Sequence, residues 1–352
     1  MSTLPRVTKA AILVEQHKPL VIAEVELPEI LDVGQVLVKI HFSGICGSQL
    51  GEIDGVKGDD PFLPHLLGHE GSATVLAVGP GVREVVPGDL VVLHWRKGLG
   101  IESAVPTYRW ADRDVSAGNV TTFNEYAVVS ENRCTAVPSS SDLAVAALFG
   151  CAVTTGFGVV ENDAQLRMGE SIVVFGSGGV GLNVIQAASL CAASPIIAVD
   201  LYENRLELAA QMGATHLVDA SETDIQEELR LIVGPAGIDV AVDNTGVAEL
   251  IQLGYQVTKS TGRVVLVGVP RTGDDVRLNT LPLHYGKRLI GSHGGGIEPH
   301  IHIPRYYELY QSAELPLDNL ITDVVALEDI NSVIVRMRSG QAAGRCMVTF
   351  NE

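Results

Sequence analysis

Two cysteines and a histidine occupy sequence settings suited to holding a metal ion. Cys46 lies in SGICGSQ, His69 follows 23 residues later in LLGHEG, and Cys151 lies a further 82 residues along in FGCAVTTG. Two thiolates and one imidazole match a catalytic zinc site, in which three protein ligands leave a fourth position for water or substrate. Sequence spacing alone does not join residues so far apart, but both cysteines lie in glycine-rich turns rather than in apolar runs.

A glycine-rich turn at residues 176–181 has the pattern that holds a dinucleotide. Gly176, Gly178 and Gly181 fit G-x-G-x-x-G, directly after the apolar run IVVF and before the helix-compatible run VGLNVIQAASL. Backbone N–H groups in this turn, including those of Gly179 and Val180, can approach a pyrophosphate at the positive end of the helix. The context of strand, turn and helix therefore predicts a cofactor site.

An acidic residue follows at the expected distance from this turn. The apolar run PIIAVD ends in Asp200, which is 24 residues after Gly176. A carboxylate there accepts hydrogen bonds from ribose hydroxyls and repels a 2′-phosphate, so NAD is expected rather than NADP. Arg205, five residues later, keeps NADP open.

With these motifs in order, the chain resembles the zinc-dependent alcohol dehydrogenases of the medium-chain dehydrogenase/reductase superfamily. The motifs GxCGS, GHE, GCxxTTG and GxGGVG follow one another in the same order as in the family, and the resemblance runs almost end to end. It implies one catalytic zinc per chain, with Cys46, His69 and Cys151 as ligands. Glu70 resembles the acid beside the metal, which can become an alternate ligand.

The resemblance also implies roles for residues around the metal and the cofactor. Ser48 corresponds to the hydroxyl that takes the substrate proton, and Trp95 to an aromatic side chain lining the substrate pocket. The remaining implied contacts are with the cofactor: Thr155, Val267 and Val269 on the nicotinamide side, and Arg345 on the pyrophosphate.

Three departures from the family pattern stand out. Gln49 replaces an aspartate that orients the metal-bound histidine, and position 51 is Gly51, where some members carry a relay histidine. Between Cys46 and Cys134 there are none of the closely spaced cysteines that hold a structural zinc in many relatives. The lobe in their place contains both tryptophans, so aromatic packing is expected to replace the second zinc.

The elements that must position these residues fall into two kinds. Up to about residue 140, short β-rich runs broken by Gly, Pro and Asp predict a mostly antiparallel domain, which the resemblance identifies as a GroES-like catalytic domain. From residue 171, six apolar runs separated by helix-compatible sequence predict a doubly wound, six-stranded parallel sheet of the Rossmann type. The expected domains are residues 1–152, 153–293, and a return segment, 294–352, that completes the first.

Composition excludes several classes of function. A formal net charge of −18 and the lack of any Lys/Arg-rich stripe argue against nucleic acid and anionic lipid as partners. No leader-like or membrane-length apolar run is present, so a cytoplasmic location is expected. Five scattered cysteines argue against a disulfide framework, and three of them are expected in the apolar core: Cys134, Cys191 and Cys346.

The combined interpretation is a zinc-dependent oxidoreductase that transfers hydride between NAD(H) and an alcohol, polyol or sugar hydroxyl, or the matching carbonyl. The resemblance implies a zinc-bound alkoxide mechanism with Ser48 as proton relay. A homodimer or homotetramer is also implied. The alternatives are a zinc-free, NADPH-dependent reductase of the same superfamily and an inactive, cofactor-binding structural protein.

Overall fold

The computed structural model describes residues 4–313 and 315–350. Contacts divide the chain into two compact units, one made of Met1–Thr154 with Glu298–Glu352 and the other of Thr155–Ile297. The domain limits expected from the sequence, after residues 152 and 293, stay a prediction. Within the described ranges, no helix is long and apolar enough to span a membrane.

The first unit is built on two sheets in which most neighbouring strands are antiparallel, as the sequence predicts. The five-stranded sheet has the order β4 (His65–Leu66), β1 (Val7–Leu13), β2 (Val21–Glu26), β7 (Tyr108–Trp110), β8 (Arg113–Val115). The seven-stranded sheet has the order β10 (Cys134–Val137), β6 (Leu90–His94), β5 (Glu70–Val78), β3 (Gln35–Gly44), β18 (Arg345–Thr349), β17 (Ile321–Ala326), with β9 (Tyr126–Ser130) paired to β3.

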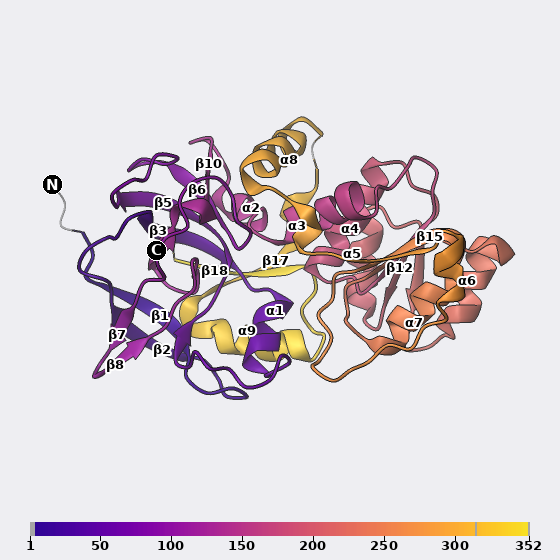
Figure 1. The fold of residues 1–352 in the computed structure, drawn as a ribbon, viewed down its shortest axis with the longest axis horizontal. Helices are drawn as coiled ribbons and strands as arrows, with labels where there is room; N and C mark the ends of the chain where they lie inside the picture. The colour runs from indigo at the N-terminus through magenta and orange to yellow at the C-terminus, as the bar shows by residue number, and fades with distance from the viewer. Residues whose placement is uncertain (1–3, 314, 351–352) are drawn as a thin grey trace. The chain divides into compact units, whose positions relative to one another are not determined.

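The end of the chain returns to this unit. Strand β18 pairs antiparallel with β3 and parallel with β17, and in Figure 1 the yellow C-terminal strands continue the sheet formed by the indigo and purple ones. The helices of the first unit are α1 (Gly47–Ile53), α2 (Leu143–Leu148), α8 (Pro299–Ala313) and α9 (Ile330–Arg338).

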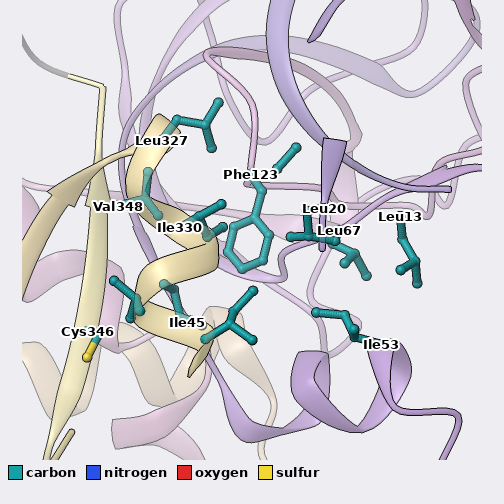
Figure 2. Close-up of a cluster of buried hydrophobic side chains, with 13 residues drawn as sticks. Leu13, Leu20, Ile45, Ile53, Leu67, Phe123, Leu327, Ile330, Cys346 and Val348 are labelled. Carbon is teal, nitrogen blue, oxygen red and sulfur yellow. The ribbon is translucent and has the colours of Figure 1, made fainter. Parts of the chain in front are cut away.

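A core cluster joins the N-terminal strands to the C-terminal helix. Figure 2 shows Ile53 of α1 and Ile330 of α9 directed toward the same group of side chains around Phe123. Cys346 belongs to this cluster and Cys134 is buried in a neighbouring one, whereas Cys191 is only half-buried after α4. Burial of this apolar surface is what holds α1, and hence the residues before it, in place.

The lobe that lacks the structural zinc cysteines is held by a buried carboxylate. Oε1 of Glu131 accepts the N–H groups of Arg83 (2.5 Å) and Glu84 (2.9 Å), and Oε2 accepts that of Ile101 (2.7 Å). Burial alone would raise the pKa of Glu131, but the three N–H donors lower it by more. The pKa is therefore below its ordinary value, and the ionised form is favoured.

The expectation that aromatic packing replaces the second zinc is therefore only partly right. Trp110 packs against a core cluster that includes Ile12 of β1 and Val25 of β2, and Arg113 lies over its ring. The segment around Ile101 is organised by Glu131 instead. Position 100 requires a glycine, because a Cβ there would lie only 2.6 Å from the Glu131 Cγ.

The second unit is a parallel sheet, as predicted. Its order is β13 (His216–Asp219), β12 (Ile196–Asp200), β11 (Ile172–Phe175), β14 (Ile238–Asp243), β15 (Thr258–Leu266), β16 (Arg288–Gly291). Starting at β11, the chain builds outward to one edge and then to the other, which is the doubly wound arrangement. The connecting helices are α4 (Gly179–Leu190), α5 (Glu203–Gln211), α6 (Ile225–Val233) and α7 (Ala248–Val257), and α3 (Ala152–Gly158) precedes β11.

Short 3-10 turns complete both units. They lie at Glu131–Arg133, Gly234–Ala236, Leu281–Tyr285, Gly294–Gly296, Leu317–Leu320 and Leu327–Asp329, and a π-helical turn at Val159–Asp163 extends α3.

Candidate active site

The three metal-ligand candidates meet within the first unit. Cys46 lies directly before α1, His69 directly before β5, and Cys151 between α2 and α3. Their ligand atoms all lie within 4.8 Å of one another. Three loops that start from adjacent strands and helices thus bring together residues more than 100 positions apart.

The donor set fits a zinc ion. Nε2 of His69 is buried and has no hydrogen-bond partner among the residues that the structure describes, while Cys46 and Cys151 are only 8% and 6% exposed. An unpaired buried imidazole nitrogen beside two sulfurs is costly unless a ligand completes it. Two sulfurs and one nitrogen are donors that zinc prefers, and three of them leave one position open.

The two thiols differ in how readily they lose a proton. The Cys151 side chain, which shares a hydrogen bond with Cys46, and the Arg345 guanidinium hold the pKa of Cys46 well below its ordinary value despite burial. The same hydrogen bond, together with burial, raises the pKa of Cys151. Burial alone would lower the pKa of His69, but the Cys46 sulfur raises it. The site thus favours one thiolate, at Cys46, beside the Cys151 thiol, and a bound divalent cation would favour ionisation of the second sulfur as well.

Glu70 and Arg345 form a buried ion pair behind the metal ligands. The guanidinium donates from Nε to Oε1 (2.9 Å) and from Nη2 to Oε2 (2.6 Å), and the two side chains are 0% and 4% exposed. This two-point contact is the strongest geometry available to an arginine and a carboxylate.

The ion pair also touches the neighbours of all three ligands. Arg345 Nη1 donates to the carbonyl of Ile45, which precedes Cys46 (3.2 Å), and Glu70 Oε2 accepts the N–H of Ala152, which follows Cys151 (3.2 Å). Glu70 itself follows His69. The pair therefore lies where it can set the positions of all three ligand-bearing loops.

Opposing effects act on the charges of this pair. Burial raises the pKa of Glu70, whereas for Arg345 burial would lower the pKa but Glu70 and Cys46 raise it far above its ordinary range. Because arginine does not lose its proton in proteins, the two short hydrogen bonds favour a charged pair.

Gln49 contacts His69 at the position where the resemblance implies an aspartate. Its Oε1 accepts the Cys46 N–H (3.0 Å), and its Nε2 lies against His69 Nδ1. A metal bound at Nε2 requires a proton on Nδ1, which needs an acceptor. The amide has one oxygen for two donors, the Cys46 N–H and the His69 Nδ1–H, whereas a carboxylate would offer one oxygen to each.

The structure places the two remaining candidates of this unit near the ligands along the chain. Ser48 is exposed in the first turn of α1, two residues after Cys46. Trp95 directly follows His94, whose backbone is paired with that of Glu70, and Arg96 lies 5.6 Å from its ring. Trp95 thus begins the loop that leaves the sheet beside His69.

In the second unit, the glycine turn connects β11 to α4 as expected. Gly176 has a φ of 87°, and a Cβ at Gly181 would lie 2.0 Å from the Gly176 carbonyl oxygen, so a side chain is excluded there. Gly178 caps α4, and Gly179 and Val180 form its first turn. Their N–H groups are the unsatisfied donors of a helix N-terminus, which can bind phosphate.

Asp200 lies at the end of the neighbouring strand and is bonded to this turn. Its Oδ2 accepts the N–H of Ser177 (2.7 Å), and its Oδ1 accepts the N–H groups of Leu201 (2.8 Å) and Tyr202 (3.2 Å). Arg205 lies 3.8 Å from Oδ1 and stacks over the Tyr202 ring at 4.8 Å. The carboxylate is therefore fixed relative to the glycine turn before any cofactor arrives.

The nicotinamide-side candidates occupy other parts of the second unit. Thr155 is buried in α3, while Val267 and Val269 follow β15 and flank Gly268. A Cβ at Gly268 would lie 2.2 Å from the Gly246 nitrogen, so the two valines belong to a tight crossing of two loops. Their contacts with a cofactor stay predictions.

Family models match both halves of the chain. The alcohol dehydrogenase GroES-like domain matches residues 32–139, and the zinc-binding dehydrogenase domain matches residues 179–312. An alcohol dehydrogenase class-3 from Cereibacter sphaeroides is 31% identical, over 97% of this chain and 100% of that protein. This chain belongs to the zinc-containing alcohol dehydrogenase family.

Other members of the family agree in sequence and in fold. An S-(hydroxymethyl)glutathione dehydrogenase from Paracoccus denitrificans is 30% identical over 95% of this chain and 98% of that protein. The crystal structure of a benzyl alcohol dehydrogenase from Acinetobacter calcoaceticus superposes with a TM-score of 0.87 at 28% identity, covering 99% of this chain and all of that one.

Some features of this zinc-type dehydrogenase were missed from its sequence. The pairing of Arg345 with Glu70 joins residues 275 positions apart, and no pattern signals it. The resemblance implies a pyrophosphate contact for Arg345, which stays a prediction; the structure adds a buried partner for the same guanidinium. The Ser177–Asp200 bond was equally invisible, although both residues lie within the dinucleotide motif.

The ion pair leads to a prediction about stability. Arg345→Met leaves Glu70 buried without its partner and should lower the free energy of unfolding by about 3–5 kcal/mol. The double variant Arg345→Met/Glu70→Gln removes the stranded charge and should recover most of that loss. Urea unfolding of zinc-saturated protein, followed by tryptophan fluorescence, measures this, because Trp95 and Trp110 both belong to the first unit. A double variant as unstable as the sum of the single ones would contradict the pairing.

Proposed function

We propose that this chain is a zinc-dependent, NAD-linked dehydrogenase that interconverts an alcohol, polyol or sugar hydroxyl and the matching carbonyl. The observation that carries the proposal is the cluster of Cys46, His69 and Cys151, whose ligand atoms lie within 4.8 Å in a buried site. Membership of the family supplies the reaction class, and the glycine turn with Asp200 supplies the cofactor class.

The residues of the first unit divide the work. Cys46, His69 and Cys151 hold the metal, and Glu70 with Arg345 keeps them in place. When bound, zinc acts as a Lewis acid on the substrate oxygen. Ser48 takes the proton of the substrate hydroxyl, and Trp95 lines the pocket that orients the substrate carbon.

The residues of the second unit bind the cofactor, which accepts or returns hydride at its nicotinamide ring. Gly176, Gly178 and Gly181, with the N–H groups of Gly179 and Val180, receive the pyrophosphate. Asp200 receives the adenosine ribose and disfavours a 2′-phosphate. Contacts on the nicotinamide side are assigned to Thr155, Val267 and Val269, and Arg345 is assigned to the pyrophosphate on resemblance alone.

Zinc content and turnover together test the metal site. The purified protein should hold about one zinc per chain and reduce NAD with alcohols from a mixed panel of aliphatic, aromatic and polyol substrates. Cys46→Ser should lose both the zinc and the activity. Cys134→Ser is the matched control, because Cys134 is equally buried but belongs to strand β10, and it should keep both.

The alternatives predict different results. A protein without zinc that oxidises NADPH would be the zinc-free reductase, and one that holds zinc and NAD without turnover would be the inactive structural protein. Either outcome would refute the proposal.

Asp200 gives a second test, of cofactor preference. Removing its charge in Asp200→Asn should lower the ratio of kcat/KM for NAD to that for NADP at least about tenfold, or about 1.4 kcal/mol. Asp219→Asn is the matched control, because Asp219 ends the next strand at the position paired with Asp200. An unchanged ratio in the Asp200 variant would show that this carboxylate does not select the cofactor.

We also propose a homodimer or homotetramer in the cytoplasm. Strand β16 is an edge strand, and four apolar or aromatic side chains on or before it are exposed: Leu281, Leu283, Tyr285 and Leu289. An open edge with exposed apolar side chains favours association with a second copy. Sedimentation velocity of the purified protein should show a dimer or tetramer, and a monomer at micromolar concentration would contradict it.

A further inference from the structure

Helix α1 places one ionisable side chain a single turn from Ser48. On an α-helix the surface neighbours of residue 48 toward the C-terminus are residues 51 and 52. Gly51 has no side chain, so Glu52 is the neighbour that can exchange a proton with Ser48. The remaining polar side chain of α1, Gln49, is buried and bonded to His69 and the Cys46 N–H.

The turn after α1 is tied to the backbone of Glu52 through Gln16. Gln16 Nε2 donates to the carbonyls of Glu52 (3.3 Å) and Gly58 (3.1 Å), and Gln16 Oε1 accepts the N–H of Asp60 (3.1 Å). Asp60 in turn bonds His65 Nε2 at 2.8 Å. These bonds fix the chain around Glu52, whose side chain is half-buried.

Glu52 also lies in the electrostatic field of the metal site. The charged and titratable groups that act on it include His69, His65, Lys57 and Asp60. Burial raises the pKa of Glu52 above its ordinary value, and His69, His65 and Lys57 only partly offset this. A carboxylate with a raised pKa is a better proton acceptor near neutral pH than an exposed one.

We propose that Glu52 is the base that receives the substrate proton from Ser48 and delivers it to solvent. The inference rests on the proposed function, and in particular on Ser48 as the first acceptor. Cβ atoms four positions apart on a helix are about 5–6 Å from each other, so a glutamate can reach a serine hydroxyl directly or through one water.

The proton balance is simple. In alcohol oxidation, the substrate O–H bond breaks and its proton passes to Ser48 Oγ as Ser48 gives its own proton to a carboxylate oxygen of Glu52. The substrate C–H bond breaks with its electron pair, which leaves as hydride to the nicotinamide. Glu52 then loses its proton to water, and the reverse sequence serves carbonyl reduction.

The test compares Glu52→Gln with Asp54→Asn over a pH range. Asp54 lies two residues further on, and its carboxylate is paired with Arg338, so its loss removes a nearby charge outside the path. Because Glu52 acts as a base when ionised, wild-type kcat for alcohol oxidation should fall as the pH drops through its raised pKa. Glu52→Gln should lower kcat at neutral pH roughly 10²-fold and abolish that acid limb. Asp54→Asn should keep the wild-type profile.

Two further measurements separate proton transfer from a structural role. Zinc per chain and the dissociation constant for NAD should be unchanged in Glu52→Gln, and added formate or imidazole should restore part of kcat. Glu52→Asp should keep an acid limb at reduced kcat. A Glu52→Gln variant with a wild-type pH profile, or with lost zinc, would overturn the proposal. Wild-type protein that turns over no alcohol would overturn the proposed function itself, a result distinct from either.

Discussion

The carboxylate of Glu70 and the guanidinium of Arg345 face each other through two hydrogen bonds in the interior of the first unit. Two charges are stable in such a place only when each satisfies the other, so the elements that carry them have little freedom to move. Glu70 opens strand β5 and Arg345 opens β18, and both strands pair with β3. The pairing of β5 and β18 with β3 therefore brings Glu70 and Arg345 together, and their ion pair in turn stabilises this arrangement of strands.

This constraint extends to the metal ligands through their chain neighbours. The contacts with Ile45 and Ala152 link the pair to the residues beside Cys46 and Cys151. Two glycines make the close packing possible: a Cβ at Gly44 would lie 2.1 Å from Glu70 Oε1, and one at Gly150 would lie 2.2 Å from the Leu93 carbonyl oxygen. The ligand geometry is thus preorganised by backbone and charge, which reduces the reorganisation needed when a metal binds.

The features that could be predicted from the sequence are those that depend on residues close together in the chain. The six parallel strands follow from continuous Val and Ile runs, and the glycine turn follows from its place between a strand and a helix. The metal ligands required more, because residues 46, 69 and 151 share no local pattern. Only the resemblance to a family assigned these three residues to a single metal site.

What could not be predicted depends on contacts between distant residues. The Glu70–Arg345 pair, the Ser177–Asp200 bond and the three donors of Glu131 are each set by how strands and loops meet in space. Two tryptophans in a lobe suggested aromatic packing because large side chains are conspicuous in a sequence. A single glutamate in the 3-10 turn after β9 is not conspicuous, yet its two oxygens organise much of that lobe.

The carboxylate of Glu131 determines which part of this protein requires zinc. A lobe held by backbone donors and a glutamate keeps its shape whether or not metal is available, so the demand for zinc is confined to the site of chemistry. Loss of the catalytic metal would leave the hydrogen bonds of this lobe in place.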